Sequence, residues 1–225
     1  MGIFRQLFGK KSEPTKNQEV MVSIAESIPN ITKDTVIYSS QIPAYVNVGN
    51  LIFEKRYEEA ISLGNKLLKD NPQSAGMHVN LMDAYFKARQ MNESYYEKST
   101  EHARLAMLYG NNTGYVQERL VINLTKDKKI YQAIQVCDII LSDGFHFSKH
   151  GCGNKEDFAK RKAKLLQQTS KSIDNENSKI FSQLEIQDII NHIKENEIHE
   201  IEEQQAVEKR LEELRKKMSL LSGKK

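Results

Sequence analysis

The stretch Tyr57-Glu-Glu-Ala60-Ile61, followed by Leu67-Leu-Lys-Asp-Asn-Pro72, is the most informative part of this 225-residue sequence. It lies in a chain with 4 Pro, 11 Gly and no Trp, among long runs of Lys, Glu, Gln, Leu and Ile. That mixture favours helices. Hydrophobic residues make up 39% and charged residues 28%, so a packed core is feasible, whereas collagen-like, mucin-like and proline-rich disordered classes are excluded.

The stretch resembles the second helix of a tetratricopeptide repeat (TPR). In that family a small residue packs between paired helices and a proline ends the unit twelve residues later, a spacing that Ala60 and Pro72 keep. The segment Val48–Phe53 upstream resembles the first helix of the same unit, with Gly49 as its small contact residue. The resemblance therefore implies an antiparallel helix pair that begins the repeat domain.

Two further helix pairs follow. The second pair joins a helix around Met77–Tyr85, whose apolar residues are spaced i, i+4, i+7, i+8, to a helix from Tyr95 to Tyr109. The third joins a helix around Leu120–Leu124 to Ile130–Leu141. We expect about three such pairs, because no pair can bury its apolar face alone.

The spacing of the small residues supports this register. Ala133 lies 34 residues after Ser99, which is the family period, and Ser99 lies 39 residues after Ala60. The polar turn Arg89–Ser94 takes up the extra residues, because surface loops tolerate insertions. The alternative is an ordinary helical bundle without repeats.

The resemblance also implies a groove, lined by the first helices, that binds an extended peptide or a partner helix. Asparagine amides both donate and accept hydrogen bonds, and an arginine fork suits a carboxylate. The predicted groove residues are Asn47, Asn50, Asn80, Asp83, Gln117, Arg119 and Asn123. One subfamily grips a C-terminal carboxylate, and Asn50, Asn80 and Arg119 match three of its positions. Val46 and Tyr115 stand where that subfamily has lysines.

The C-terminal part reads as a capping helix, a linker and a long helix. Residues 155–168 are expected to cap the stack, which gives a repeat domain over 41–169, and residues 170–180 form a polar linker. Residues 181–225 form the long helix, with apolar residues in one alternating 4-3 register interrupted by Glu197, Glu200 and Gln204. The seam residues are Ile186, Ile190, Ile193, Val207, Leu211, Leu214 and Met218. We expect this seam to meet a second copy or a partner helix; the alternative is folding back onto the body.

The N-terminal segment 1–11 is amphipathic and basic, with Ile3, Phe4, Leu7 and Phe8 on one helical face. Such a segment suits weak contact with an anionic membrane surface. The alternative is a terminal helix that docks on the body. Residues 12–40 read as a linker without firm assignment.

One loop gathers metal-capable side chains: His146, His150 and Cys152. This spacing is not one of the strong zinc patterns, so they are weak metal candidates and the alternative is a glycine-rich connection. Phosphate-loop, zincin and nucleophile-elbow motifs are absent, so no catalytic residue and no cofactor is predicted. The net charge of +3 does not indicate nucleic-acid binding.

The sequence therefore predicts an all-α protein: a short TPR-like, right-handed stack of helical hairpins followed by a long C-terminal helix. Its two cysteines suit a reducing compartment, and we expect a cytoplasmic location, with membrane-peripheral contact through residues 1–11 as the alternative. The predicted function is a non-enzymatic adaptor or scaffold that binds a protein or peptide. The alternatives are a membrane-peripheral scaffold and a small metal-binding protein.

Overall fold

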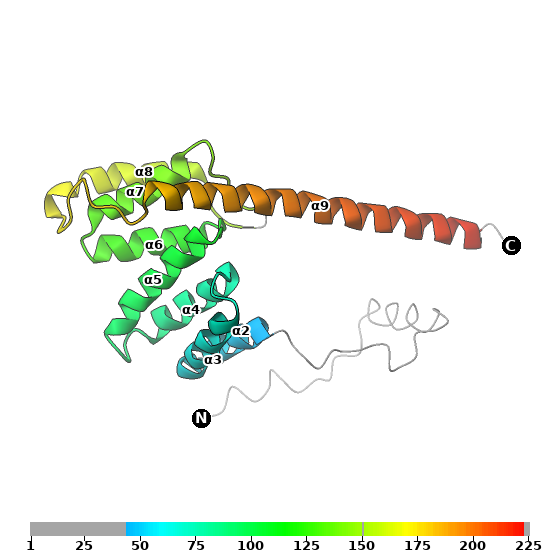
Figure 1. Cartoon of the computed structure of the whole chain (residues 1–225), viewed down its shortest axis with the longest axis horizontal. Coiled ribbons are helices and arrows are strands. Elements are labelled where there is room, and N and C mark those ends of the chain that lie inside the picture. Colours follow the sequence, from blue (N-terminus) through cyan, green and yellow to red (C-terminus); the bar gives the residue numbers. More distant parts are fainter. Residues whose placement is uncertain (1–43, 150, 223–225) are drawn as a thin grey trace, which may run out of the picture. The chain divides into compact units, whose positions relative to one another are not determined.

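The computed structural model describes residues 44–149 and 151–222; the predictions for segments 1–11 and 12–40 lie outside these ranges. Within them the chain forms eight α-helices and no strand, which confirms an all-α fold with a long C-terminal helix (Figure 1). The helices are α2 (Ala44–Phe53), α3 (Tyr57–Asp70), α4 (Ala75–Ala88), α5 (Ser94–Leu108), α6 (Tyr115–Lys126), α7 (Ile130–Leu141), α8 (Lys155–Leu166) and α9 (Gln183–Ser222). A 3-10 turn, η1 (Thr169–Lys171), follows α8.

Each helix from α2 to α7 packs on the next one along the chain, and α2 also packs on α4. The small residues predicted at the helix contacts, Ala60, Ser99 and Ala133, are fully buried. Ser99 Oγ also donates to the Met82 carbonyl oxygen at 2.9 Å, which ties α5 to α4. Small side chains at these contacts allow the helix axes to approach closely.

The glycine that allows close packing is not the predicted one. A methyl group added at Gly49 would meet no described atom within 4 Å, so the expected contact role of Gly49 is wrong. At Gly64 the added carbon would lie 2.8 Å from a Leu81 side-chain carbon. The Leu81 side chain of α4 therefore packs directly on Gly64 of α3, and a larger residue there would displace Leu81.

The buried side chains form two clusters. The smaller lies between α2, α3 and α4, with Val48 and Leu81 fully buried. The larger runs from Met82 on α4 to α9 and includes Phe145, Phe158 and Phe181 from the segments that follow α7. These three phenylalanines close the apolar side that α6 and α7 leave open, and they are at most 3% exposed.

The segment predicted as a linker, 170–180, is instead bound along α7. The Asp174 carboxylate accepts hydrogen bonds from the backbone N–H groups of Tyr131 (3.2 Å) and Gln132 (3.0 Å), so it satisfies free donors at the start of α7. The Gln135 side chain accepts from the Ile180 N–H at 2.7 Å and donates to the Phe181 carbonyl at 2.7 Å. The segment therefore fixes where α9 begins.

The first part of α9 belongs to the core. Ile189 and Ile193 are fully buried, and Ile186 and Ile190 pack against the larger cluster. Placing Ile186, Ile190 and Ile193 in a seam for another chain was therefore wrong, because they cover this chain's own body. His192 Nδ1 lies 3.0 Å from the Leu108 carbonyl oxygen, which fastens α9 to the end of α5.

Beyond Glu200 the helix leaves the body. Val207, Leu211, Leu214 and Met218 are 47–70% exposed. None of the helices within 44–149 and 151–222 combines the length and apolar character needed to cross a bilayer.

A pair of histidines lies between α4 and α5. His78 Nε2 lies 3.0 Å from the Pro72 carbonyl oxygen, and the Nδ1 atoms of His78 and His102 lie 2.8 Å apart. A carbonyl only accepts, so His78 carries its proton on Nε2 and its Nδ1 accepts from the Nδ1–H of His102. Burial lowers the pKa of both imidazoles, that of His102 to about 4. Both rings are therefore neutral in the folded protein near pH 7.

Replacing Ile193 by alanine should lower the free energy of unfolding by about 2–5 kcal/mol, because the smaller side chain leaves a cavity in a fully buried position. Leu184→Ala is the matched control: Leu184 lies on the same helix and is 79% exposed, so its loss should change the unfolding free energy by about 0.5 kcal/mol or less. Urea unfolding measures both. Equal losses would show that α9 does not pack as described.

Acidification should destabilise the protein before most carboxylates titrate. The pKa values of His78 and His102 are lower in the folded state than their ordinary value of 6.5, so the unfolded chain takes up protons first as the pH falls. The stabilisation from the neutral pair is complete above about pH 6.5 and is lost progressively toward pH 4.

Thermal unfolding between pH 7 and pH 5 measures this slope. His102→Gln should flatten it, whereas His199→Gln, on the outer part of α9, should leave it unchanged. A variant of His102 with the wild-type slope would contradict the assignment.

Candidate functional site

The structure brings polar and aromatic side chains together on one side of α4, α6 and α8. Three contacts join these helices: Tyr115 to Asp83, Arg119 to Phe86, and Arg161 to Glu118. We call this surface the α4–α6–α8 face. Its members are Asp83, Phe86, Lys87, Arg89, Tyr115, Glu118, Arg119, Lys126, Lys160, Arg161 and Lys164.

The most specific feature of this face is an aromatic ring covered by arginines. The Arg119 guanidinium carbon lies 3.6 Å from the centre of the Phe86 ring, and that of Arg89 lies 4.1 Å from it. Arg89 Nη1 also donates to the Phe86 carbonyl oxygen at 2.5 Å. Stacking on a ring holds a guanidinium through its flat side and leaves its N–H donors directed sideways. Arg119 is thus held in place against Phe86, and its guanidinium also interacts with the Tyr115 hydroxyl.

Asp83 connects the same two helices. Its carboxylate accepts from the Tyr115 hydroxyl at 2.8 Å and pairs with Lys87 Nζ at 2.7 Å. Burial and the hydrogen bond to Asp83 raise the pKa of Tyr115, so its hydroxyl stays protonated. With Asp83 engaged in this way, the negative charge on the α4 part of the face is neutralised.

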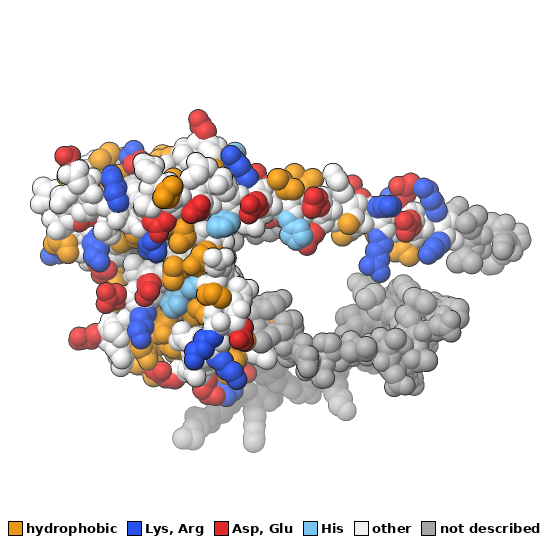
Figure 2. All heavy atoms as spheres, in the orientation of Figure 1, with side chains coloured by type: hydrophobic (Ala, Val, Ile, Leu, Met, Phe, Trp, Pro, Cys, Tyr) orange, Lys and Arg blue, Asp and Glu red, His pale blue; other side chains and the backbone are white. Residues whose placement is uncertain are grey.

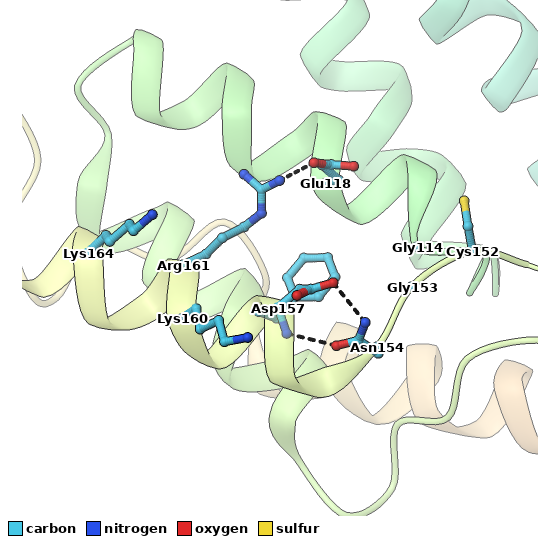
Figure 3. A pocket seen from close by; sticks show the side chains of 10 residues that line it. Gly114, Glu118, Cys152, Gly153, Asn154, Asp157, Lys160, Arg161 and Lys164 are labelled. Atoms are coloured by element: carbon cyan, nitrogen blue, oxygen red, sulfur yellow. Dashed lines mark hydrogen bonds and ion pairs between the residues drawn. The ribbon is translucent and has the colours of Figure 1, made fainter.

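A pocket of about 490 Å³ lies between the start of α6 and α8 (Figure 3). Glu118 and Arg161 form an ion pair on its wall, and Lys160 and Lys164 line it from α8. Asn154 begins α8 by accepting from the Asp157 N–H at 2.8 Å. The pocket therefore carries more positive than negative side chains.

A second hollow, of about 230 Å³, lies further along the same two helices. It has an apolar floor of Val121, Ile122 and Leu165, and Lys126 and Lys164 stand at its edge. The α6–α8 part of the face thus offers apolar contact and cations side by side, which suits a chain segment with acidic and apolar side chains.

The predicted groove residues divide into two groups. Asp83 and Arg119 lie on the α4–α6–α8 face, Asn80 is partly buried on α4, and Asn47 and Asn50 are exposed on α2. Gln117 and Asn123 are fully buried, so their prediction as groove residues was wrong.

Gln117 is buried because it holds the turn before α6. Its Oε1 accepts from the Gly114 N–H at 2.8 Å, and its Nε2 donates to the Asn111 carbonyl oxygen. Gly114 itself has φ +80°, and an added carbon there would lie 1.7 Å from the Cys152 carbonyl oxygen. The turn therefore requires glycine, and Gln117 serves the fold instead of a ligand.

The loop with the weak metal candidates packs against this turn. The Ser148 N–H donates to the Asn112 carbonyl at 3.0 Å, and the Asn112 amide donates to the His146 carbonyl at 3.0 Å. His146 and Cys152 are exposed, while His150 lies outside the described residues. Within the described ranges no three His, Cys, Asp or Glu side chains gather closely enough to hold a metal ion.

Phe86, Tyr115 and Arg161 lie on the α4–α6–α8 face but were not among the site residues predicted from the sequence. Phe86 follows the buried Tyr85 and carries no distinctive sequence signal, and its side chain is half-buried. Arg161 lies among the basic residues of the predicted capping helix, and its pairing with Glu118 on α6 is a contact that the sequence does not reveal.

Asn123→Leu should raise the free energy of unfolding by about 1–3 kcal/mol. Neither amide atom of the buried Asn123 side chain hydrogen-bonds to a described residue, and a leucine, which has the same branching and the same number of side-chain heavy atoms, removes that desolvation cost. Gln117→Leu is the control and should destabilise, because it leaves the Gly114 N–H and the Asn111 carbonyl without their partner. Chemical unfolding of the wild type and the two variants measures these differences. A loss of stability in Asn123→Leu would contradict the conclusion that the buried Asn123 amide has no hydrogen-bond partner among the described residues.

Comparison of the chain with known proteins finds no relative. No protein family, curated protein or solved structure matches the chain. What the chain does must therefore be inferred from its own residues.

Proposed function

We propose that this chain is a non-catalytic interaction protein whose α4–α6–α8 face binds an acidic segment of a partner protein in an extended conformation. The observation that carries the proposal is the stacking of Arg119 on Phe86, which holds a guanidinium of α6 against an aromatic ring of α4. A carboxylate is the natural acceptor for such a fork, and an aromatic ring beside it adds apolar contact.

The charges of the face support an acidic ligand. Seven lysines and arginines lie on it, and its acidic members are engaged, Asp83 by Lys87 and Glu118 by Arg161. The pocket adds Asp157, whose carboxylate accepts from the Asn154 amide, and Lys160 pairs with Glu156. An incoming carboxylate therefore meets an excess of cations. Such attraction speeds association and weakens as salt is added.

The order of the helices also supports the proposal. The resemblance to tetratricopeptide repeats implies that first helices line the binding groove, and here α4 and α6 carry most of the face. The hollow between α6 and α8, with its apolar floor, extends the same surface. A peptide lying across α4, α6 and α8 would contact the ring, the arginine fork and this floor in sequence.

Selection from a random peptide library, followed by fluorescence anisotropy with the selected peptides, tests the proposal. We expect enrichment of Asp and Glu next to an aromatic or aliphatic residue. Arg119→Ala and Phe86→Ala should each weaken binding about tenfold or more, a loss of about 1.4 kcal/mol. Arg56→Ala, which removes an exposed arginine from the turn between α2 and α3, is the matched control and should bind as wild type.

Peptides with a free and an amidated C-terminus separate two forms of recognition. A requirement for the free end would favour capture of a terminal carboxylate by Asn50, Asn80 and Arg119. Selected peptides without acidic residues, or unchanged affinity in both Arg119→Ala and Phe86→Ala, would contradict the proposal.

A further inference from the structure

The hollow of about 230 Å³ between α6 and α8 is surrounded by positive charge. We call it the α6–α8 hollow. The charged side chains that line it are those of Lys126, Arg161 and Lys164, and no carboxylate among the described residues lines it. Figure 2 shows acidic and basic side chains intermixed over the face of the body that it draws. An apolar floor with only cations around it is therefore a local feature.

Two of these three cations have no carboxylate partner among the described residues. Arg161 pairs with Glu118, whereas Lys164 makes no such pair and Lys126 Nζ lies 6.0 Å from the centre of the Tyr96 ring. In Figure 3, Arg161 and Lys164 extend from α8 toward α6. The edge of the hollow thus attracts carboxylates of a ligand.

The size and the floor of the hollow suit one apolar side chain. Pockets that hold a whole small molecule measure about 300–1,000 Å³, so this hollow is smaller than such pockets. Val121, Ile122 and Leu165 offer apolar contact, and the Thr125 hydroxyl donates to the Val121 carbonyl oxygen at 2.7 Å, so it needs no partner from a ligand. The acyl chain of a lipid is too long for this space, whereas a leucine, methionine or phenylalanine side chain fits it.

The position of Arg119 relative to the hollow sets the spacing of two ligand side chains. Arg119 covers Phe86 between α4 and α6, and the hollow lies between α6 and α8. Packed helices lie about 8–10 Å apart, so the two sites are separated by about 10 Å across α6. Along α6, the lining residues within 121–126 are centred about 7 Å beyond Arg119, at about 1.5 Å per residue. The two displacements together give about 12 Å.

An extended chain covers this distance in four residues. Each residue advances about 3.3 Å, and residues separated by an even number of positions lie on the same side of the chain. We infer that the α6–α8 hollow receives a large apolar side chain that lies four residues from the acidic residue bound by Arg119. This inference rests on the proposed function, because the spacing is counted from Arg119.

A second acidic residue belongs two positions beyond the apolar one. Lys164 lies on α8, so it is on the side of the hollow away from α4. Two residues of an extended chain span about 7 Å and return to the same side, which brings a second carboxylate to Lys164. The ligand is therefore an acidic segment in which one large apolar residue lies between two carboxylates at unequal distances.

Peptide libraries test the spacing. Each library has one fixed Glu and one fixed Leu, separated by two to six positions in either order, with the other positions random, and selection is on the full chain. We expect the separation of four to be enriched about tenfold over separations of three and five, because odd separations place the two side chains on opposite sides of the peptide.

Variants of the full chain test the hollow itself. Ile122→Gln should weaken binding of a selected peptide about tenfold, and changing the peptide's Leu to Ala should weaken binding to the wild type by a similar factor. Both changes together should weaken binding little more than either alone, because they remove the same contact. Ile173→Gln, at a position 70% exposed outside the α4–α6–α8 face, is the matched control and should bind as wild type.

A substitution at the edge of the hollow avoids changing the half-buried Ile122. Lys164 is exposed, so Lys164→Ala should fold as wild type and weaken only those peptides that carry the second acidic residue. Urea-unfolding midpoints of all variants show that each is folded.

The outcomes separate this inference from the proposed function. Equal enrichment at every separation, or independent losses from Ile122→Gln and from the change of the peptide's Leu, would overturn the inference; the proposed function would stand if Arg119→Ala still weakened binding. Libraries with Glu that are enriched no more than libraries with Gln in its place would overturn both. Binding of phosphatidylserine vesicles that Ile122→Gln abolishes, without an enriched peptide, would also overturn both and indicate a lipid ligand.

Discussion

A helix pair with one apolar face needs a neighbour to bury it, and this requirement shapes the whole described part of the chain. The pairs satisfy it by stacking in chain order, and the last open side is closed by segments from beyond α7. Phe181, Ile189 and Ile193 are fully buried there. The side chains that α4, α6 and α8 carry on one side contact one another and form one surface.

That surface is held together by contacts from each helix to the next. Tyr115 reaches Asp83, Arg119 covers Phe86, and Arg161 pairs with Glu118. Contacts of this kind at the surface contribute little to the free energy of unfolding. Their main effect is to position the side chains of the α4–α6–α8 face. They hold these side chains in fixed positions, which would lower the conformational-entropy cost of binding a ligand there.

The helices themselves could be predicted well from the sequence. The resemblance to a tetratricopeptide repeat predicted a helix start at Tyr57 and a helix over Ile130–Leu141, where α3 begins and α7 lies, and hydrophobic periodicity predicted the helix around Met77–Tyr85 that is part of α4. The capping helix was expected from residue 155, where α8 begins, and the length of α9 followed from the absence of glycine and proline. Periodicity succeeds because it reports which face of a helix is buried, whichever neighbour covers it.

The same property explains the errors. Ile186, Ile190 and Ile193 have the spacing of a seam for another helix, but a face that covers the chain's own body has the same period. Gln117 and Asn123 are polar residues on a first helix, and polarity alone did not reveal that a turn built on Gly114 and the core enclose them. Contacts between residues far apart in the sequence explain each of these errors, and a single sequence does not reveal such contacts.

Two separate surfaces result: a cationic, aromatic face on the stacked helices and an apolar stripe on the outer part of α9. The first is the basis of the proposed function. Hydrogen–deuterium exchange of the full chain, with and without a selected acidic peptide, tests it most directly. We expect added protection in α4, α6 and α8 with α7 unchanged; protection confined to α7 or to α9 would contradict the role of the α4–α6–α8 face.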